Sequence, residues 1–306
     1  MDTSYPNLET IWPGWEIEKL IGSGLGGNVY KAKRNIHGII MESAVKIIVT
    51  PEDQDRSAPK TGKTPEIDYE LYKSKADDGI NEISCLLQLK NSNHIVNIED
   101  FALIKRNDAI KWNVFIRMEL LRSLTDHLMD RKQMREDEVI KLGMDLSEAV
   151  MQCEKKHIIH RDIKVENLYI TEDGSFKLGD FGIAIDADHT ENASKKGNKN
   201  YMAPEVFRER KYGKTTDIYS IGMILYMLSN ANKMPFYDSD YFTAGAEEKE
   251  QAARRRIYGE TIPDACNAFG GLNSIILKAC SYDPEKRYPD AKALYNDLKM
   301  LLGKKI

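Results

Sequence analysis

The chain has 306 residues, 42% of them hydrophobic and 30% charged, which is ordinary for a soluble globular protein with one large core or two smaller ones. Its formal net charge of −4 gives no general attraction to nucleic acid or to an anionic membrane. The four cysteines lack CxxC spacing and no apolar run approaches the ~20 residues of a membrane helix, so we expect a cytoplasmic protein with reduced thiols, or the cytosolic domain of a longer, membrane-anchored one.

The first third of the chain has the pattern of a β-sheet. Alternating and β-rich runs predict strands at 15–21, 29–33, 39–49, 101–104 and 113–118. In the third of these strands Ala44, Lys46 and Ile48 share one face, because the side-chain period of a strand is two.

Between the third and fourth strands, the pattern predicts a loop and then two helices. Residues 51–65 contain three prolines and many polar side chains, which is typical of a loop. A short extra helix is expected at 66–76. A second helix is expected after it, because Ile83, Leu86 and Leu87 repeat at helical spacing.

From about residue 122 onward the pattern becomes mostly helical. Long amphipathic or buried helices are marked by apolar residues at helical spacing, namely Val139, Leu142, Leu146 and Val150, then Ile218, Ile221 and Leu225, then Leu294, Leu298 and Leu301. The dipeptide Asp173–Gly174 predicts a hairpin turn between strands at 168–170 and 176–178. The sequence therefore predicts an α+β fold, with a small sheet-rich lobe at 1–121 and a larger helical lobe at 122–306.

A glycine-rich segment with G-x-G-x-x-G-x-V spacing separates the first two strands. It consists of Gly22, Ser23, Gly24, Leu25, Gly26, Gly27, Asn28 and Val29. Glycine lets backbone N–H groups approach a phosphate closely. A dinucleotide-binding fold would need a helix directly after the glycines. A strand follows instead, so we expect the bend of a β-hairpin that lies over a nucleotide, with a simple flexible turn as the alternative.

Lys46 and Glu82 form a candidate pair. Lys46 lies inside the third predicted strand, and Glu82 lies one helical turn before Leu86. A lysine held by a carboxylate can grip the α- and β-phosphates of a nucleotide. Each residue alone is more commonly a solvated side chain, and nothing in the sequence alone brings the two together.

The segment His160–Asn167 reads H-R-D-I-K-V-E-N, and Asp180-Phe181-Gly182 begins 18 residues after Asp162. Asp162 can accept a hydrogen bond from a substrate hydroxyl and take its proton late, and Lys164 can neutralise charge on a moving phosphoryl group. Asn167 and Asp180 offer the hard oxygen ligands that Mg²⁺ prefers. Each residue alone fits a loop or capping role, but their order and spacing point to phosphoryl transfer.

With these motifs, the chain from about residue 15 to 302 resembles a eukaryotic-type (Hanks-type) Ser/Thr protein kinase catalytic domain. Later landmarks agree: residues 201–205 end in Ala-Pro-Glu, residues 217–222 match the start of a buried central helix, and Arg287 is expected to pair with Glu205. Lys164, two residues after Asp162, is typical of Ser/Thr rather than Tyr kinases. The run 259–263 is similar to bacterial members.

The resemblance implies a two-lobed kinase fold and roles for individual residues. The catalytic residues it implies are Lys46, Glu82, Asp162, Lys164, Asn167 and Asp180, with Asn167 and Asp180 as metal ligands. The ATP-binding positions it implies, beside Lys46 and the glycine-rich segment, are Ile21, Ala44, Met118, Glu119, Leu121 and Tyr169, with Met118 as gatekeeper. A hydrophobic spine is implied for Leu86, Ile98, His160 and Phe181.

The resemblance also implies ATP with Mg²⁺, or Mn²⁺ in its place, as cofactors. It implies protein substrates with Ser or Thr, autophosphorylation, and a transient homodimer as a further expectation, without nucleic acid or membrane insertion. Arg161 before Asp162 implies a switch by phosphate on the activation loop, for which Thr190 and Ser194 are acceptors. Lys195, Lys196 and Lys199 add local positive charge. Arg254, Arg255 and Arg256 are expected on an exposed helix face, where substrate docking is one alternative to plain solvation.

Four positions depart from the family pattern. Tyr169 replaces an aliphatic residue on the pocket floor, Asn198 replaces the threonine that usually follows Gly197, and Val165 replaces a common proline. The stretch between Lys46 and Glu82 is longer than usual, with an insertion at about 51–79 that repositions the following helix, binds a partner, or is simply tolerated. These departures leave a nucleotide-binding, pseudokinase-like scaffold as the alternative function. A kinase-fold enzyme for small molecules is disfavoured by Ala203-Pro204-Glu205.

Overall fold

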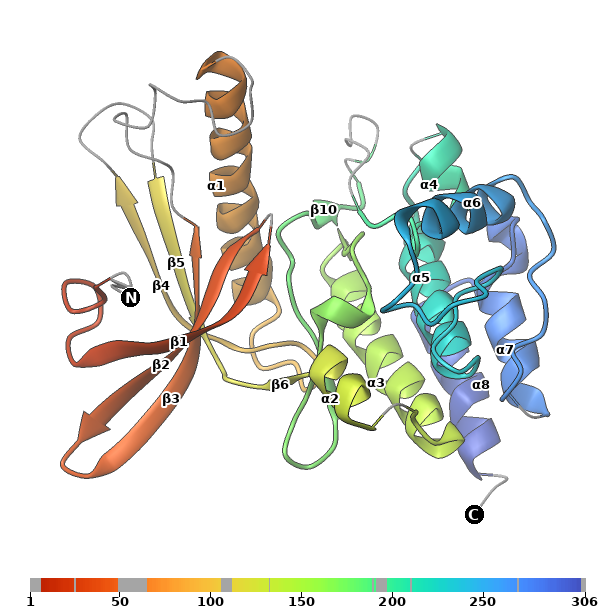
Figure 1. Ribbon diagram of the computed structural model, residues 1–306, viewed down its shortest axis with the longest axis horizontal. Helices are drawn as coiled ribbons and strands as arrows, with labels where there is room; N and C mark the ends of the chain where they lie inside the picture. The colour runs from red at the N-terminus through yellow and green to blue at the C-terminus, as the bar shows by residue number, and fades with distance from the viewer. Residues whose placement is uncertain are drawn as a thin grey trace. The chain divides into compact units, whose positions relative to one another are not determined.

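The computed structural model describes residues 7–24, 26–48, 65–105, 112–131, 133–188, 190, 197–209, 211–268 and 270–303 (Figure 1). The chain divides into two compact units. The N-terminal unit comprises Met1–Lys90 and Val96–Leu121, and the C-terminal unit comprises Asn91–Ile95 and Arg122–Ile306. Within the described residues, no helix combines the length and the apolar character needed to cross a membrane. The four cysteines are all unpaired thiols, as expected.

The N-terminal unit contains one five-stranded antiparallel sheet. Its strands are β1 (Trp15–Gly24), β2 (Gly27–Ile36), β3 (Ile39–Ile48), β4 (Ile98–Lys105) and β5 (Trp112–Met118). Their spatial order is β1-β2-β3-β5-β4. All five predicted strands are therefore confirmed, with ends that differ from the prediction by a few residues.

The two faces of this sheet have different coverings, because successive side chains of a strand point to opposite sides. On one face, Val45 and Ile47 of β3 join a buried cluster with Phe115 of β5. On the other face, Lys46 and Ile48 contact helix α1 (Pro65–Gln88), which runs along the sheet in Figure 1. The predicted alternation in the third strand is confirmed.

Helix α1 is one continuous element of 24 residues. The expectation of a separate short helix at 66–76 is therefore wrong, because no proline interrupts the run after Pro65. Its apolar stripe also differs from the prediction, since Leu87 is 43% exposed while Ile83 and Leu86 are buried. Of the insertion expected at 51–79, residues 65–79 form the first turns of α1, and the preceding part lies outside the described residues.

Gly79 allows α1 to lie close to the sheet. A Cβ atom at this position would lie 2.5 Å from the Ile48 Cδ1 atom and 3.2 Å from the Val114 Cγ1 atom. A glycine inside a helix costs about 1 kcal/mol relative to alanine. That cost is offset here by the close packing of helix and sheet, which sets the height of α1 over β3.

A segment before the first strand covers the other face of the sheet. Leu8 and Trp12 are buried there together with Trp15. The Trp12 indole Nε1 donates to the Asp100 carboxylate at 2.8 Å. The Arg117 guanidinium lies 5.5 Å from the Trp12 ring centre and 4.7 Å from that of Trp15, within the range of cation–π attraction. No element was predicted for this segment from the sequence.

The C-terminal unit is mostly helical. Its helices are α2 (Leu124–Arg131), α3 (Glu136–Lys155), α4 (Pro204–Glu209), α5 (Lys214–Leu228), α6 (Ala246–Ile257), α7 (Gly271–Ala279) and α8 (Ala291–Gly303), with short 3-10 turns at Val165–Asn167 and Pro284–Lys286. Every residue of α5 from Thr216 to Leu228 is buried, as the apolar pattern predicted. Gly143 of α3 allows close packing, since a Cβ there would lie 2.8 Å from Leu298 of α8 and 3.1 Å from Leu225 of α5.

Short strands complete this unit. They are β6 (Arg122–Ser123), β7 (Ile158–Ile159), β8 (Leu168–Ile170), β9 (Phe176–Leu178) and β10 (Ile185–Asp186). β6, β8 and β9 form one sheet, and β7 pairs with β10. The predicted hairpin is confirmed, and the α+β class with a sheet-rich part followed by a helical part is confirmed as well.

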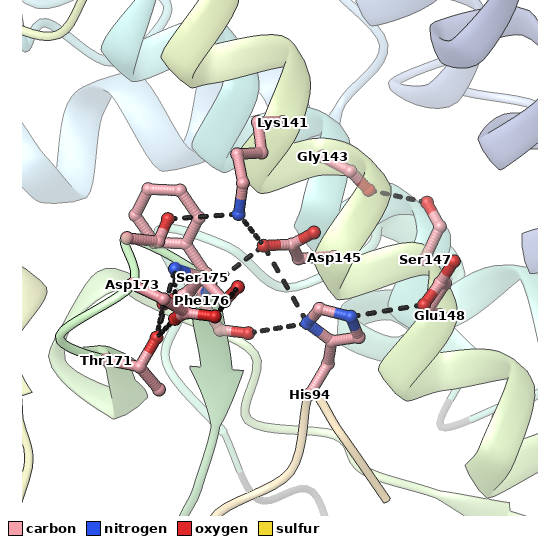
Figure 2. A network of polar contacts seen from close by, with 11 residues as sticks. His94, Lys141, Gly143, Asp145, Ser147, Glu148, Thr171, Asp173, Ser175 and Phe176 are labelled. Atoms are coloured by element: carbon pink, nitrogen blue, oxygen red, sulfur yellow. Dashed lines mark hydrogen bonds and ion pairs between the residues drawn. The ribbon is translucent and has the colours of Figure 1, made fainter.

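The segment Asn91–Ile95 belongs to the C-terminal unit, to which His94 binds it. Its Nδ1 atom lies 3.0 Å from the Phe176 carbonyl oxygen of β9, and its Nε2 atom lies 3.1 Å from a Glu148 carboxylate oxygen of α3 (Figure 2). Asp145 of α3 accepts the Phe176 amide at 2.9 Å and the Lys141 ammonium at 2.8 Å. This polar network fixes the 91–95 segment to the helix and hairpin next to it.

We expect Trp12→Ala to lower the free energy of unfolding by about 3 kcal/mol, because a buried ring is removed from a packed cluster. Trp12→Phe keeps most of the buried area and loses only the bond to Asp100, so its cost should be about 1 kcal/mol. Urea unfolding followed by circular dichroism measures both. Equal unfolding midpoints for Trp12→Ala and the wild type would contradict the packing of this segment.

Candidate active site

The glycine-rich segment forms the bend of a β-hairpin, as the sequence predicted. Gly22 pairs with Val29, Ser23 with Asn28, and Gly24 with Gly27 across β1 and β2. The Ser23 hydroxyl donates to the Asn28 side-chain oxygen at 2.8 Å. Leu25 lies outside the described residues.

Two glycines let this hairpin approach β3. Gly27 has φ +112°, and a Cβ there would lie 2.7 Å from the Ile47 carbonyl oxygen, so no side chain fits without moving the backbone. A Cβ on Gly26 would lie 3.4 Å from the Lys46 Nζ atom. The backbone of the hairpin therefore runs directly beside the lysine ammonium.

Lys46 and Glu82 meet in the N-terminal unit. The Lys46 Nζ atom lies 2.7 Å from the Glu82 Oε2 atom, with the two residues only 6% and 2% exposed. β3 supplies the lysine and α1 supplies the glutamate. Burial leaves neither charge well solvated, so each depends on the other for compensation. The solvated-surface alternative for both residues is wrong.

Further positions implied for adenine binding lie on the same unit. Ala44 is buried and is the antiparallel neighbour of Met118 on β5. The Glu119 amide donates to the Asn97 carbonyl oxygen at 3.2 Å, so a contact from this residue to a base would use its own carbonyl. Val29, Leu121 and Met118 are half-buried, and Ile21 is exposed.

The loop that carries Asp162 is fixed by a buried carboxylate of α5. Asp217 Oδ2 accepts the His160 amide at 2.8 Å, and Asp217 Oδ1 accepts the Arg161 amide at 3.0 Å. Burial raises the pKa of Asp217, while the two amide donors act in the opposite direction. The start of this loop is therefore fixed in position by α5.

His160 is a buried, neutral spacer. Its Nε2 atom lies 3.1 Å from the Gly179 carbonyl oxygen, and its Nδ1 atom accepts the Asp162 amide at 3.2 Å. Only the neutral tautomer with hydrogen on Nε2 satisfies both bonds, and burial accordingly lowers the pKa of the imidazole. The ring packs edge-on against Phe181 with 4.5 Å between centres. The other two residues of the implied spine, Leu86 and Ile98, are buried in the N-terminal unit.

Asp162 is held by two neighbouring side chains. Its Oδ2 atom accepts the Lys164 ammonium at 2.5 Å and the Asn167 amide at 3.1 Å. The same Asn167 amide group donates to the Asp162 carbonyl oxygen at 2.9 Å. Asp162 Oδ1 has no donor among the residues that the structure describes, so one carboxylate oxygen is fixed and the other can accept a proton donor from outside.

Asp180 lies at the end of the turn after β9. It has φ 60°, a left-handed conformation that aspartate tolerates better than most residues and that often occurs at functional sites. The Gly179 amide donates to the Asn167 carbonyl oxygen at 2.9 Å, which joins this turn to the Asp162 loop. Tyr169 lies on β8, half-buried, opposite Lys177 of β9.

The donor set of Asn167 and Asp180 fits a hard divalent cation. The Asn167 Nδ2 atom is committed to Asp162, which leaves its Oδ1 atom as the ligand, and Asp180 offers a carboxylate. Across the described part of the chain, no group of three or more His, Cys, Asp or Glu side chains could hold a metal ion. Mg²⁺ needs only one or two protein carboxylates, because substrate phosphates complete its coordination.

The segment after the Asp180 turn has the expected anchor at its end. Arg287 donates to both carboxylate oxygens of Glu205 at 2.8 and 2.7 Å, as predicted. The Arg161 guanidinium lies 4.4 Å from the Tyr212 ring centre. Asn198 accepts the Asn200 amide at 3.0 Å through its side chain, so it shapes its own turn. Thr190 is half-buried, while Ser194, Lys195 and Lys196 lie outside the described residues.

The arginine run at the end of α6 differs from the expectation of one exposed face. Arg254 pairs with Glu250 at 3.3 Å and Arg255 with Glu260 at 2.7 Å. Arg256 is only 3% exposed. Alanines 252 and 253 are buried as well, and Arg256 follows them at helical spacing, which was the available signal in the sequence.

Comparisons with known proteins agree with this geometry. The family model described as "Protein kinase domain" matches residues 15–298. The chain is 31% identical over 292 residues to a probable serine/threonine-protein kinase of Clostridium perfringens, a match covering 94% of this chain and 38% of that protein. It is 31% identical over 234 residues to a calcium/calmodulin-dependent protein kinase type 1 of Caenorhabditis elegans, covering 74% of this chain and 63% of that protein. The chain thus spans less than two thirds of the length of both relatives.

We expect Gly27→Ala to lower the free energy of unfolding by about 2 kcal/mol. Alanine would be strained at the positive φ of this position, and its Cβ atom would clash with the Ile47 carbonyl oxygen. Gly24→Ala is the matched control, because nothing lies within 4 Å of a Cβ there and its φ is ordinary. Chemical denaturation of both variants tests this. Equal losses in the two variants would show that the close approach at Gly27 does not exist.

Proposed function

The chain belongs to the protein kinase family, and from this premise we propose that it transfers the γ-phosphoryl group of ATP to Ser or Thr hydroxyls of proteins. Its relatives include serine/threonine-protein kinases, which supports the Ser/Thr class. Residues 1–121 would bind the nucleotide, and residues 122–306 would supply the catalytic loop and the protein-substrate site. A cytoplasmic location is part of this proposal, and the four unpaired thiols favour it.

The observation that carries this proposal is the arrangement of Asp162. Lys164 and Asn167 hold its Oδ2 atom, and its Oδ1 atom has no donor among the described residues. A substrate hydroxyl would donate its hydrogen bond to Oδ1 and so be oriented toward the phosphoryl group. As the bond from this hydroxyl oxygen to the γ-phosphorus forms, the bond from the γ-phosphorus to the bridging oxygen breaks, ADP leaves, and the hydroxyl proton passes to Asp162.

Lys46 would act on the nucleotide rather than on the hydroxyl. Its ammonium is held by Glu82 and lies beside the glycine-rich hairpin. Positive charge and backbone N–H groups in one place suit the α- and β-phosphates. Because Glu82 already holds the Lys46 ammonium in place, this side chain would not need to reorganise when ATP binds.

Asn167 and Asp180 would hold the divalent cation. When bound, that cation neutralises the charge that develops on the β- and γ-phosphates. Lys164, whose ammonium lies 2.5 Å from Asp162, would stabilise the transferred group from the side of the acceptor. Autophosphorylation at Thr190 or Ser194 and a transient homodimer extend this proposal and follow from the family alone.

We expect Asp162→Asn to lower phosphorylation of a generic protein substrate by roughly 10²–10⁴-fold, the usual contribution of a positioned acid–base residue. The assay uses Mg²⁺ and γ-labelled ATP, with label traced to Ser and Thr. Asp126→Asn makes the same change on the exposed surface of α2 and should keep full activity.

Equal labelling by Asp162→Asn and the wild type would sink the role given to Asp162. Absence of labelling by either protein, together with a thermal shift on adding ATP and Mg²⁺, would favour the nucleotide-binding scaffold instead.

A further inference from the structure

We propose that Arg256 is a positioning residue for the protein substrate, which it serves by fixing the backbone of residues 199–202. This inference rests on the proposed kinase function. Arg256 is a buried side chain of α6 that has no direct part in the proposed phosphoryl transfer.

Arg256 holds two carbonyl groups of this segment at once. Its Nη1 atom donates to the Met202 carbonyl oxygen at 2.9 Å, and its Nη2 atom donates to the Lys199 carbonyl oxygen at 2.6 Å. Nη1 also donates to the Tyr219 hydroxyl of α5 at 3.0 Å. A planar guanidinium can serve three acceptors in fixed directions, so the segment is tied to both α5 and α6 by one side chain.

Arg256 is a buried cation, and its hydrogen-bond partners are neutral. Within the described residues its acceptors are two carbonyls and a phenol, and no carboxylate pairs with it. Burial raises the pKa of Tyr219, so the phenol stays neutral beside the guanidinium. A buried cation without a counter-ion is costly to desolvate. The contribution of Arg256 is therefore geometric: it directs hydrogen bonds to backbone groups.

The other residues of the segment are held in the same way. The Ser220 hydroxyl of α5 donates to the Tyr201 carbonyl oxygen at 3.1 Å. The Tyr237 hydroxyl donates to the Asn200 side-chain oxygen at 3.1 Å. Each residue from Lys199 to Met202 thus has a side chain from outside the segment bound to it.

The segment lies against the loop that carries Asp162. A Cβ on Gly197 would lie 2.8 Å from the Arg161 carbonyl oxygen. At the other end, the Tyr201 ring packs 5.7 Å from that of Tyr241, whose hydroxyl donates to Glu166 at 2.8 Å. Because this segment adjoins the loop that carries Asp162, the conformation held by Arg256 shapes the surface next to the acceptor.

Arg256→Met removes the three bonds at nearly constant length, and Arg256→Lys keeps the charge but loses the fork. We expect Arg256→Met to raise the KM for a protein substrate, or lower its kcat/KM, by about tenfold to a hundredfold, because small misplacements of a substrate have large effects on rate. The KM for ATP should stay at the wild-type value. Arg256→Lys should recover only part of the loss.

Two further variants complete the experiment. Ser220→Ala releases the Tyr201 carbonyl from α5 and should raise the protein-substrate KM in the same direction, which keeps the proposal testable if Arg256→Met does not fold. Arg131→Met changes an exposed arginine of α2 and should behave as the wild type. Hydrogen exchange should become faster at the amides of 198–202 in the Arg256 variants.

The outcomes separate the two proposals. An active wild type with unchanged substrate kinetics in Arg256→Met and Ser220→Ala would overturn the role of Arg256 alone. Parallel losses for ATP and protein substrate would show a general structural role and overturn it too. A wild type that phosphorylates no protein would overturn the proposed function, and this inference with it.

Discussion

Asp217 accepts the amide protons of His160 and Arg161 from a helix that is buried from Thr216 to Leu228, and these two bonds set where the catalytic loop begins. The same helix reaches other segments through its remaining polar side chains. Ser220 binds the Tyr201 carbonyl, and the Tyr219 hydroxyl accepts from Arg256. Because α5 is buried from Thr216 to Leu228, it cannot shift without disturbing the core. The loop that carries Asp162 and the segment 199–202 are therefore both held rigid by α5.

Asp217 and His160 are tolerated at this depth because the hydrogen-bonding groups of both are satisfied. Burial raises the pKa of Asp217 and lowers that of His160, so burial opposes charge on both. The carboxylate receives two backbone amides, and the neutral imidazole uses one nitrogen as donor and the other as acceptor. A fully satisfied buried network is rigid, whereas one missing partner would leave a costly orphan. The loop that carries Asp162 is thus fixed at its start, while Asp162 Oδ1 has no donor among the described residues.

How much of this could be predicted depends on whether a feature is local. Strand alternation placed Lys46 and Ile48 on one face of β3, and the spacing of Asp162, Asn167 and Asp180 identified the chemistry. Contacts between residues that are distant in the sequence were harder to predict. The arginine run of α6 looked solvated because its first two members are, although the period of the helix assigns the third to the buried side with Ala252 and Ala253. Two of the three acceptors of Arg256 are backbone carbonyls, which every residue type carries, so the sequence does not mark them.

The long connection between Lys46 and Glu82 illustrates why such an insertion need not disturb the pair. Gly79 and Glu82 are three positions apart on α1 and so share a face. Gly79 is the point where the helix touches Ile48, two residues beyond Lys46 on the same side of β3. The packing of Gly79 on Ile48 therefore positions the helix next to the ion pair between Glu82 and Lys46. Loop length changes the closing entropy only slowly, by about 0.6 kcal/mol for each doubling. The distance along the chain from Lys46 to Glu82 is thus uncoupled from the 2.7 Å between their charged atoms.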